Sequence, residues 1–157
     1  MPHPRLRPLV LALSLATVPA FAQEAPHAHA PGHDATATAA PAAPAGRWAT
    51  DAPLREGMRE IGGIVGALGH YEMGHLESGQ AVMLAGQVEE TIAGIVANCR
   101  LEPDADAALH VVLAALAQGA ARFQQDPDDH AAVAAMRQAL ADYARLFDDP
   151  GFEVPSA

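Results

Sequence analysis

"VEETIAGIVANCRLEPDADAALHVVLAAL", residues 88–116, carries two runs of apolar side chains that recur at alternating spacings of four and three residues. This spacing is the period of one face of an α-helix. Between the runs, Pro103 is suited to the first turn of a helix, and Asp104 and Asp106 follow where the helix dipole favours negative charge. The segment therefore predicts two amphipathic helices joined by a short connection, running over about 78–99 and from 103 onward.

The same alternation extends outward into a first helix that ends near Gly74 and a fourth that stops before "DDPG". Thr50 or Asp51 is the expected N-cap of the first helix, and Asp126 or Asp128 that of the fourth. The predicted core positions, helix by helix, are Leu54, Met58, Ile61, Val65, Leu68; Ala81, Ala85, Val88, Ile92, Ile95, Cys99; Leu109, Leu113, Leu116, Ala120, Phe123; Val133, Met136, Leu140, Tyr143, Phe147. This pattern predicts an all-α fold, an up-down-up-down antiparallel four-helix bundle over residues 48–149 with a C-terminal tail at 150–157.

Residues 1–22 have the layout of a secretory signal peptide. Arg5 and Arg7 precede the apolar run "LVLALSLATVPA", which is shorter than the roughly 20 residues of a membrane-spanning helix. Ala20 and Ala22 then form a small-x-small cleavage signal. We expect an exported, periplasmic protein with no membrane span after cleavage, the alternative being an uncleaved anchor.

Residues 23–47 are dominated by Ala, Pro, His and Thr, so we expect a disordered linker. It contains His27, His29 and His33, and short histidine-rich tracts are typical of metal binding. A solvated linker without a ligand is the alternative.

The charge of the chain disfavours one class of partner. There is no lysine, and after signal removal seven arginines stand against 19 acidic residues, a formal charge of −12. Such a surface repels nucleic acid and attracts cations or a basic partner. The single cysteine, Cys99, excludes an internal disulfide and leaves a metal ligand, an intermolecular disulfide, a free thiol or a buried apolar side chain.

Antiparallel order is expected to bring Met58, Cys99, His110 and Tyr143 to one end of the bundle. Thioether, thiolate and imidazole together suit a soft ion such as copper. Each residue also has a plain structural alternative, as core filler for Met58 and Cys99 and as a hydrogen-bonded helix residue for His110.

The opposite end collects a second set of candidate ligands, His70, Met73 and His75, together with Met83 and His130. His70 and Met73 are three residues apart and thus neighbours on one helix face. Metal capture and favourable placement of histidines at a helix C-terminus are both open.

Gly62, Gly66 and Gly69 fall on one face of the first helix. We expect either close packing of a neighbouring helix or a groove for a flat ligand or a protein partner. No Ser–His–Asp set, phosphate loop or HExxH motif is present, so we expect a protein that is not an enzyme.

Residues 50–148 resemble the exported four-helix-bundle proteins of the cytochrome c-prime and soluble b-type cytochrome group. The likeness includes "LREGMREI", in which Met58 matches the position of the haem-ligating methionine of the b-type members. Haem as cofactor is what this resemblance implies, held by Met58 and, because the fourth helix lacks the family's late histidine, by His110. The CxxCH attachment motif of the c-prime members is absent.

The chain also resembles small exported bacterial proteins with histidine-rich N-termini and an "NCxLxPxADxxLH" segment, here residues 98–110. From these observations we expect a periplasmic metal-binding bundle, with copper as the metal, that acts in metal buffering or homeostasis. The alternatives are a haem-binding electron carrier and a cofactor-free structural or stress adaptor that binds protein partners or a second copy.

Overall fold

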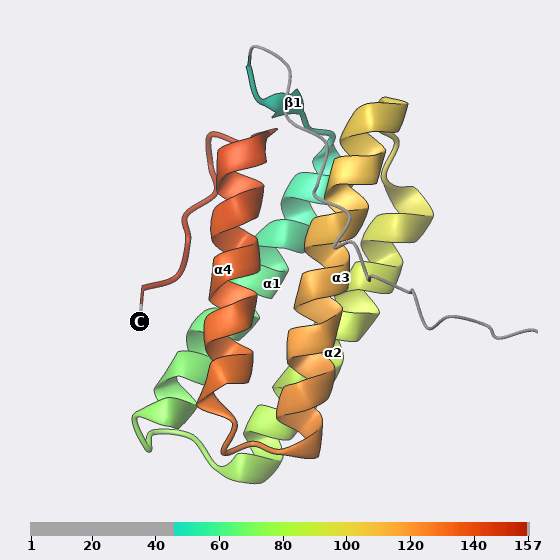
Figure 1. Ribbon diagram of the computed structural model, residues 1–157. Coiled ribbons are helices and arrows are strands. Elements are labelled where there is room, and N and C mark those ends of the chain that lie inside the picture. Colours follow the sequence, from blue (N-terminus) through green and yellow to red (C-terminus); the bar gives the residue numbers. More distant parts are fainter. Residues whose placement is uncertain (1–45, 157) are drawn as a thin grey trace, which may run out of the picture. The chain divides into compact units, whose positions relative to one another are not determined.

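The computed structural model describes residues 46–156, which fold into four helices and two very short strands (Figure 1). The helices are α1 (Ala52–Glu72), α2 (Ser78–Asn98), α3 (Pro103–Gln125) and α4 (His130–Leu146). Strand β1 (Trp48–Ala49) pairs with β2 (Phe147–Asp148). The all-helical prediction is confirmed for this part of the chain. None of its helices combines the length and apolar character needed to cross a membrane.

Local chemistry at the helix ends explains these bounds. Asp51 is the N-cap of α1, and its side chain accepts a hydrogen bond from the Leu54 backbone N–H at 2.9 Å. Gly74 adopts φ 77° just after α1, a conformation that glycine reaches without steric cost. The expected cap of α4 was wrong by one residue, because Asp129 accepts from the Ala131 N–H while Asp126 accepts from within the preceding turn.

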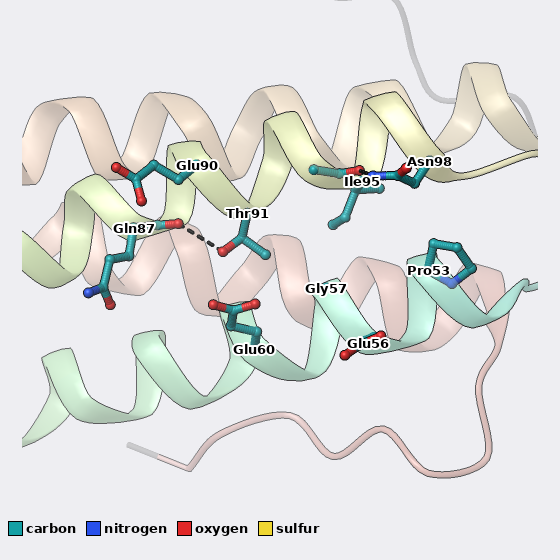
Figure 2. Close-up of a pocket in the computed structure, with 10 residues that line it drawn as sticks. Pro53, Glu56, Gly57, Glu60, Gln87, Glu90, Thr91, Ile95 and Asn98 are labelled. Carbon is teal, nitrogen blue, oxygen red and sulfur yellow. Dashed lines mark hydrogen bonds between the residues drawn. The ribbon is translucent and has the colours of Figure 1, made fainter.

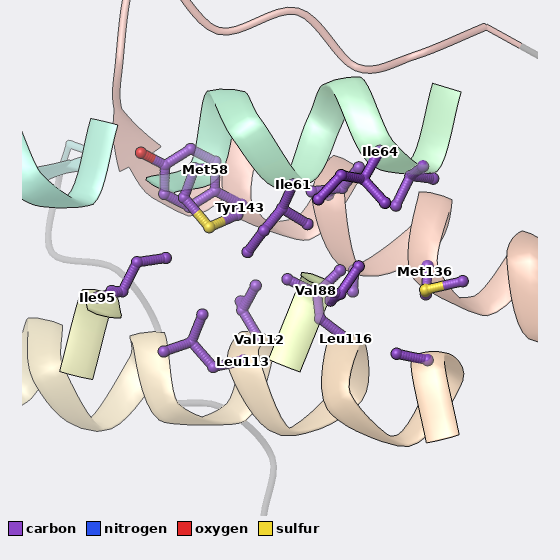
Figure 3. Close-up of a cluster of buried hydrophobic side chains, with 14 of the residues drawn as sticks. Met58, Ile61, Ile64, Val88, Ile95, Val112, Leu113, Leu116, Met136 and Tyr143 are labelled. Carbon is purple, nitrogen blue, oxygen red and sulfur yellow. The ribbon is translucent and has the colours of Figure 1, made fainter. Parts of the chain in front are cut away.

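Each helix packs against the next along the chain, and α4 packs against α1, around one apolar core (Figures 1 and 3). The predicted core positions of α1, α3 and α4 are buried throughout. In α2, only Ile92 and Cys99 of the predicted positions are half-buried, whereas the others are buried. Glycine allows two close helix contacts, Gly57 of α1 against Ile95 of α2 and Gly119 of α3 against Met136 of α4.

The pairing of β1 with β2 joins the two ends of the helical region. The strands are parallel, with Trp48 opposite Phe147 and Ala49 opposite Asp148. Thr50 Oγ1 also donates to the Asp148 carbonyl at 2.7 Å. Two residues are too few for a periodic pattern, so the strands could not be read from the sequence.

The segment that follows β2, residues 150–156, turns back along the helices, and we call it the C-terminal strap (Figure 1). A Cβ atom added at Gly62 would lie 3.5 Å from the Phe152 ring, and one added at Gly66 would lie 3.6 Å from Pro155. The strap, rather than a neighbouring helix, therefore occupies the glycine face of α1 at Gly62 and Gly66. Gly69, further along α1, instead lies against the Arg137 side chain of α4.

Candidate functional site

Cys99 lies at the C-cap of α2, where its thiol meets the N-cap of α1. The two oxygens of Asp51 accept from the backbone N–H groups of Leu54, at 2.9 Å, and of Arg100, at 2.7 Å. Burial raises the pKa of the Cys99 thiol from its ordinary 9.0 to about 11, and the charge of Asp51 and its hydrogen bond with the thiol add to the effect. The Cys99 thiol therefore stays neutral to a higher pH than an ordinary cysteine does.

The raised pKa of Cys99 gives a prediction for alkaline pH. Because folding favours the neutral thiol, its contribution to stability is complete below pH 9.0 and is lost as the pH rises through about 11. We expect the free energy of unfolding, measured in urea, to fall over this range, and Cys99→Ala to make the decline shallower. Equal slopes for the two proteins would contradict the assignment.

Met58 and Tyr143 belong to the same buried cluster (Figure 3). Met58 has 0% of its surface exposed, and Tyr143 donates from its hydroxyl to Asp149 Oδ2 at 3.0 Å. Burial, together with the negative charge of Asp149, raises the pKa of the Tyr143 phenol. Met58 therefore fills the core beside a buried hydrogen-bonded pair.

His110 faces the surface of α3 and not the core. Its side chain is 58% exposed, and Nδ1 lies 2.8 Å from the Asp106 carbonyl oxygen and 3.4 Å from Asp106 Oδ2. The charge of Asp106 also reaches Cys99. The exposed His110 ring and the fully buried Met58 side chain are therefore not brought together.

The positions of Met58 and His110 show whether these two residues can hold a haem together. Axial ligation requires Met58 and His110 to face one iron from opposite sides. Met58 is enclosed by core side chains, whereas the His110 ring lies outside against its own helix. In this conformation the two residues do not form a haem-ligating pair.

The second set of candidate ligands is brought together at the end of α1. The rings of His70 and His75 have centroids 6.4 Å apart, and the His75 N–H donates to the His70 carbonyl at 2.9 Å. Met73, between them in sequence, is 55% exposed. Two imidazoles and a thioether therefore share one solvent-accessible turn, which Gly74 makes possible by its positive φ.

The other members of that end have different partners. Glu72 Oε2 pairs with Arg137 at 2.9 Å, and Glu72 Oε1 lies 3.5 Å from His130 Nδ1. Met83 is largely exposed on α2. His130 therefore belongs to an ion-pair cluster with Glu72 and Arg137. Of the three histidines at this end, His70 and His75 are the two whose rings lie close together.

Sequence reasoning missed a groove between α1 and α2 (Figure 2). The groove has a volume of about 680 Å³, and three carboxylates, those of Glu56, Glu60 and Glu90, line it together with Thr91 and polar neighbours. The four-residue spacing of Glu56 and Glu60 was the available signal, since it places both on one helix face. At the base of the groove, Gly57 of α1 packs against Ile95 of α2, and the absence of a side chain at Gly57 allows the two helices to lie close together.

Within residues 46–156, no group of three or more His, Cys, Asp or Glu side chains is placed to hold a metal ion. At the end of α1, two histidines, His70 and His75, lie close together, and the third candidate donor there is the thioether of Met73. The expected ligands His27, His29 and His33, and the expected signal peptide, lie outside the described residues. Comparison with known proteins finds no matching family model, no similar curated protein and no similar solved structure.

Proposed function

We propose that this chain is an exported, periplasmic up-down-up-down four-helix bundle that binds and buffers copper. The observation that carries the proposal is the pairing of His70 and His75, with ring centroids 6.4 Å apart, around the exposed thioether of Met73. His27, His29 and His33 form a second capture segment near the N-terminus of the exported chain. The layout of residues 1–22 supports the export route.

Copper is the metal that best suits these donors. Thioether sulfur selects soft ions such as Cu(I), and imidazole nitrogen is a good ligand for copper in both oxidation states. All three side chains are exposed and extend from one turn at the end of α1. The strongly negative charge of the chain raises the local concentration of cations.

The proposal predicts which substitutions abolish copper binding. In the full chain with His27, His29 and His33 replaced by alanine, His70→Ala with His75→Ala is expected to weaken Cu(I) affinity at least about tenfold, because two of three donors are lost. The measurement is competition with a chromophoric Cu(I) chelator. Protons compete for imidazole nitrogen, so affinity should also fall as the pH is lowered.

The matched control removes the other candidate ligands in the same background. Cys99→Ser with His110→Ala changes a thiol at the end of α2 and an imidazole in the first half of α3, whereas Met73 lies at the end of α1, so copper affinity should stay unchanged. If instead this control loses copper while the His70 and His75 variant keeps it, the metal site lies at Cys99 and the proposal is wrong.

A cofactor-free adaptor is a second candidate, favoured by the seat of the strap on α1. Phe152 and Pro155 lie on Gly62 and Gly66, so this face of α1 is already in contact with two apolar side chains. A protein partner that bound there would have to displace the strap. Copper-independent capture of a partner, lost in Gly62→Leu, would favour this candidate over copper buffering.

A further inference from the structure

Helix α3 carries a second stripe of evenly spaced side chains on its outer face, in addition to the stripe in the core. This outer stripe consists of Ala107, Val111, Ala114 and Gln118, which recur at spacings of four, three and four residues. All four are exposed, and Val111 keeps 38% of its surface open to solvent. Because α3 packs against α2 and α4, no helix of the described residues covers this face.

A hollow of about 420 Å³ follows the outer stripe. Val111, Ala114 and Gln118 line it, together with His110 and Ala115. Short side chains such as alanine allow a second helix to approach closely, because the distance between packed helices depends on the side chains at their contact. The spacing and the hollow together suit a helix as the partner.

The part of α3 that carries the outer stripe has almost no charge. Between Asp106 and Arg122 the sequence contains no Asp, Glu, Lys or Arg, and His110 is the one ionisable side chain. The chain as a whole has a net charge of −10. Two copies therefore repel each other least where they meet on this uncharged surface, whereas a basic partner is attracted to the carboxylates elsewhere.

The two ends of α3 carry opposite charges on the same side of the helix. Asp104 lies in the first turn and Arg122 in the last, and their separation of 18 residues corresponds to about five complete turns. Arg122 is 53% exposed, and it donates from Nε and Nη2 to Asp129, which holds the guanidinium in place. An antiparallel pair of α3 helices places each Asp104 beside the Arg122 of the other copy. A parallel pair would instead bring like charges together.

We propose that the chain forms a homodimer in which the α3 helices of two copies pack antiparallel along their outer stripes. In the register that brings Asp104 beside Arg122, Val111 of each copy packs against Ala114 of the other. A larger side chain thus meets a smaller one at the centre of the contact. Opposed helix dipoles favour the same orientation. The dimer does not depend on copper binding.

Sedimentation velocity of the full chain, as the cell exports it, tests the dimer. The parent carries Cys99→Ser to exclude disulfides, and a metal chelator is present. It should sediment increasingly as a dimer as the protein concentration rises. Ala114→Glu brings two carboxylates close together at the two-fold axis, so the dissociation constant should rise at least about tenfold. Ala134→Glu, the same exchange at an exposed alanine of α4, is the matched control and should leave the dimer unchanged.

Engineered cysteines in the Cys99→Ser background test the orientation of the two helices. In the antiparallel register, Ala107 of one copy lies opposite Gln118 of the other, whereas the two copies of Ala107 lie about 16 Å apart along the helices. A disulfide requires Cα atoms within about 7 Å of each other. Ala107→Cys and Gln118→Cys should therefore cross-link when the two proteins are mixed, and neither should cross-link alone.

The outcomes that contradict the homodimer are distinct. A parent that stays monomeric at every concentration would overturn it, as would equal weakening by Ala114→Glu and Ala134→Glu. Cross-links formed by Ala107→Cys alone would overturn the antiparallel arrangement. Because Ala114 is exposed, the circular dichroism spectrum of Ala114→Glu should match that of the parent. Val111→Glu changes the opposite side of the same contact and must also weaken the dimer.

Discussion

Gly119→Val is expected to lower the free energy of unfolding by about 3 kcal/mol, the upper range of overpacking effects. Gly119 is buried in α3 where α4 crosses it, and an added Cβ atom would overlap the Met136 side chain. It would also lie 3.2 Å from the Ala132 carbonyl oxygen, which is backbone and cannot rotate away. The two helices must therefore separate, and urea unfolding measures the loss.

Gly94→Ala is the matched control, because it changes a glycine within a helix that touches nothing. No heavy atom lies within 4 Å of a Cβ atom built there, so the substitution should stabilise the protein by about 0.5–1 kcal/mol through helix propensity alone. We therefore expect the free energy of unfolding to fall in Gly119→Val and to rise in Gly94→Ala. If Gly119→Val unfolds at the same urea concentration as the parent, the close crossing of α3 and α4 is wrong.

Asp51→Ala is expected to lower the free energy of unfolding by about 2–3 kcal/mol, the combined effect of a lost helix cap and a lost charge-assisted hydrogen bond. One carboxylate oxygen caps α1 and the other accepts from the Arg100 N–H after α2, 49 residues away in sequence. Removing both leaves two backbone donors without their partner. Urea unfolding monitored by circular dichroism gives the magnitude.

Asp51→Ser separates the two contributions. Serine keeps one oxygen for the cap of α1 but has neither the second oxygen nor the charge, so it should recover about 1 kcal/mol of the loss. In both variants the pKa of the Cys99 thiol should fall from about 11 but stay above 9.0, because burial, the largest cause of the rise, remains while the charge of Asp51 is gone. Thiol labelling rates across pH report this shift, and an unchanged pKa would contradict the contact.

The helices could be predicted because their cause is local. Each core stripe repeats at the helical period, and the residues Pro103, Gly74 and Asp51 that begin or end helices act on their own neighbours. The cap of α4 was missed by one position because "DPDD" offers several carboxylates and only the turn geometry selects Asp129. Local sequence narrows such a choice without deciding it.

The candidate site was harder to predict because side-chain direction changes by about 100° with each helical residue. Leu109 is buried, whereas His110, the next residue, faces solvent. Sharing one end of a bundle therefore does not make residues share a cavity. The proximity of His70 and His75 could be anticipated, because their separation is short and Gly74 turns the chain between them.

The strap lay beyond sequence reasoning for a different reason. Residues 150–156 have no repeating pattern, and their attachment depends on contacts of Phe152 and Pro155 with glycines that lie about ninety positions earlier in the sequence. The sequence predicted a close contact at Gly62 and Gly66, but glycine does not indicate which segment makes that contact. Which segment packs against these glycines depends on the direction that the chain takes after β2.

The parallel pairing of β1 with β2 has a mechanical consequence. Trp48 and Phe147 stand side by side, and the chain leaves the pair in opposite directions, before β1 and after β2. Tension applied between these exits pulls the two strands past each other along their length. The backbone hydrogen bonds between the two strands then resist the force together. The four helices bear this force only after the β1–β2 pair has separated.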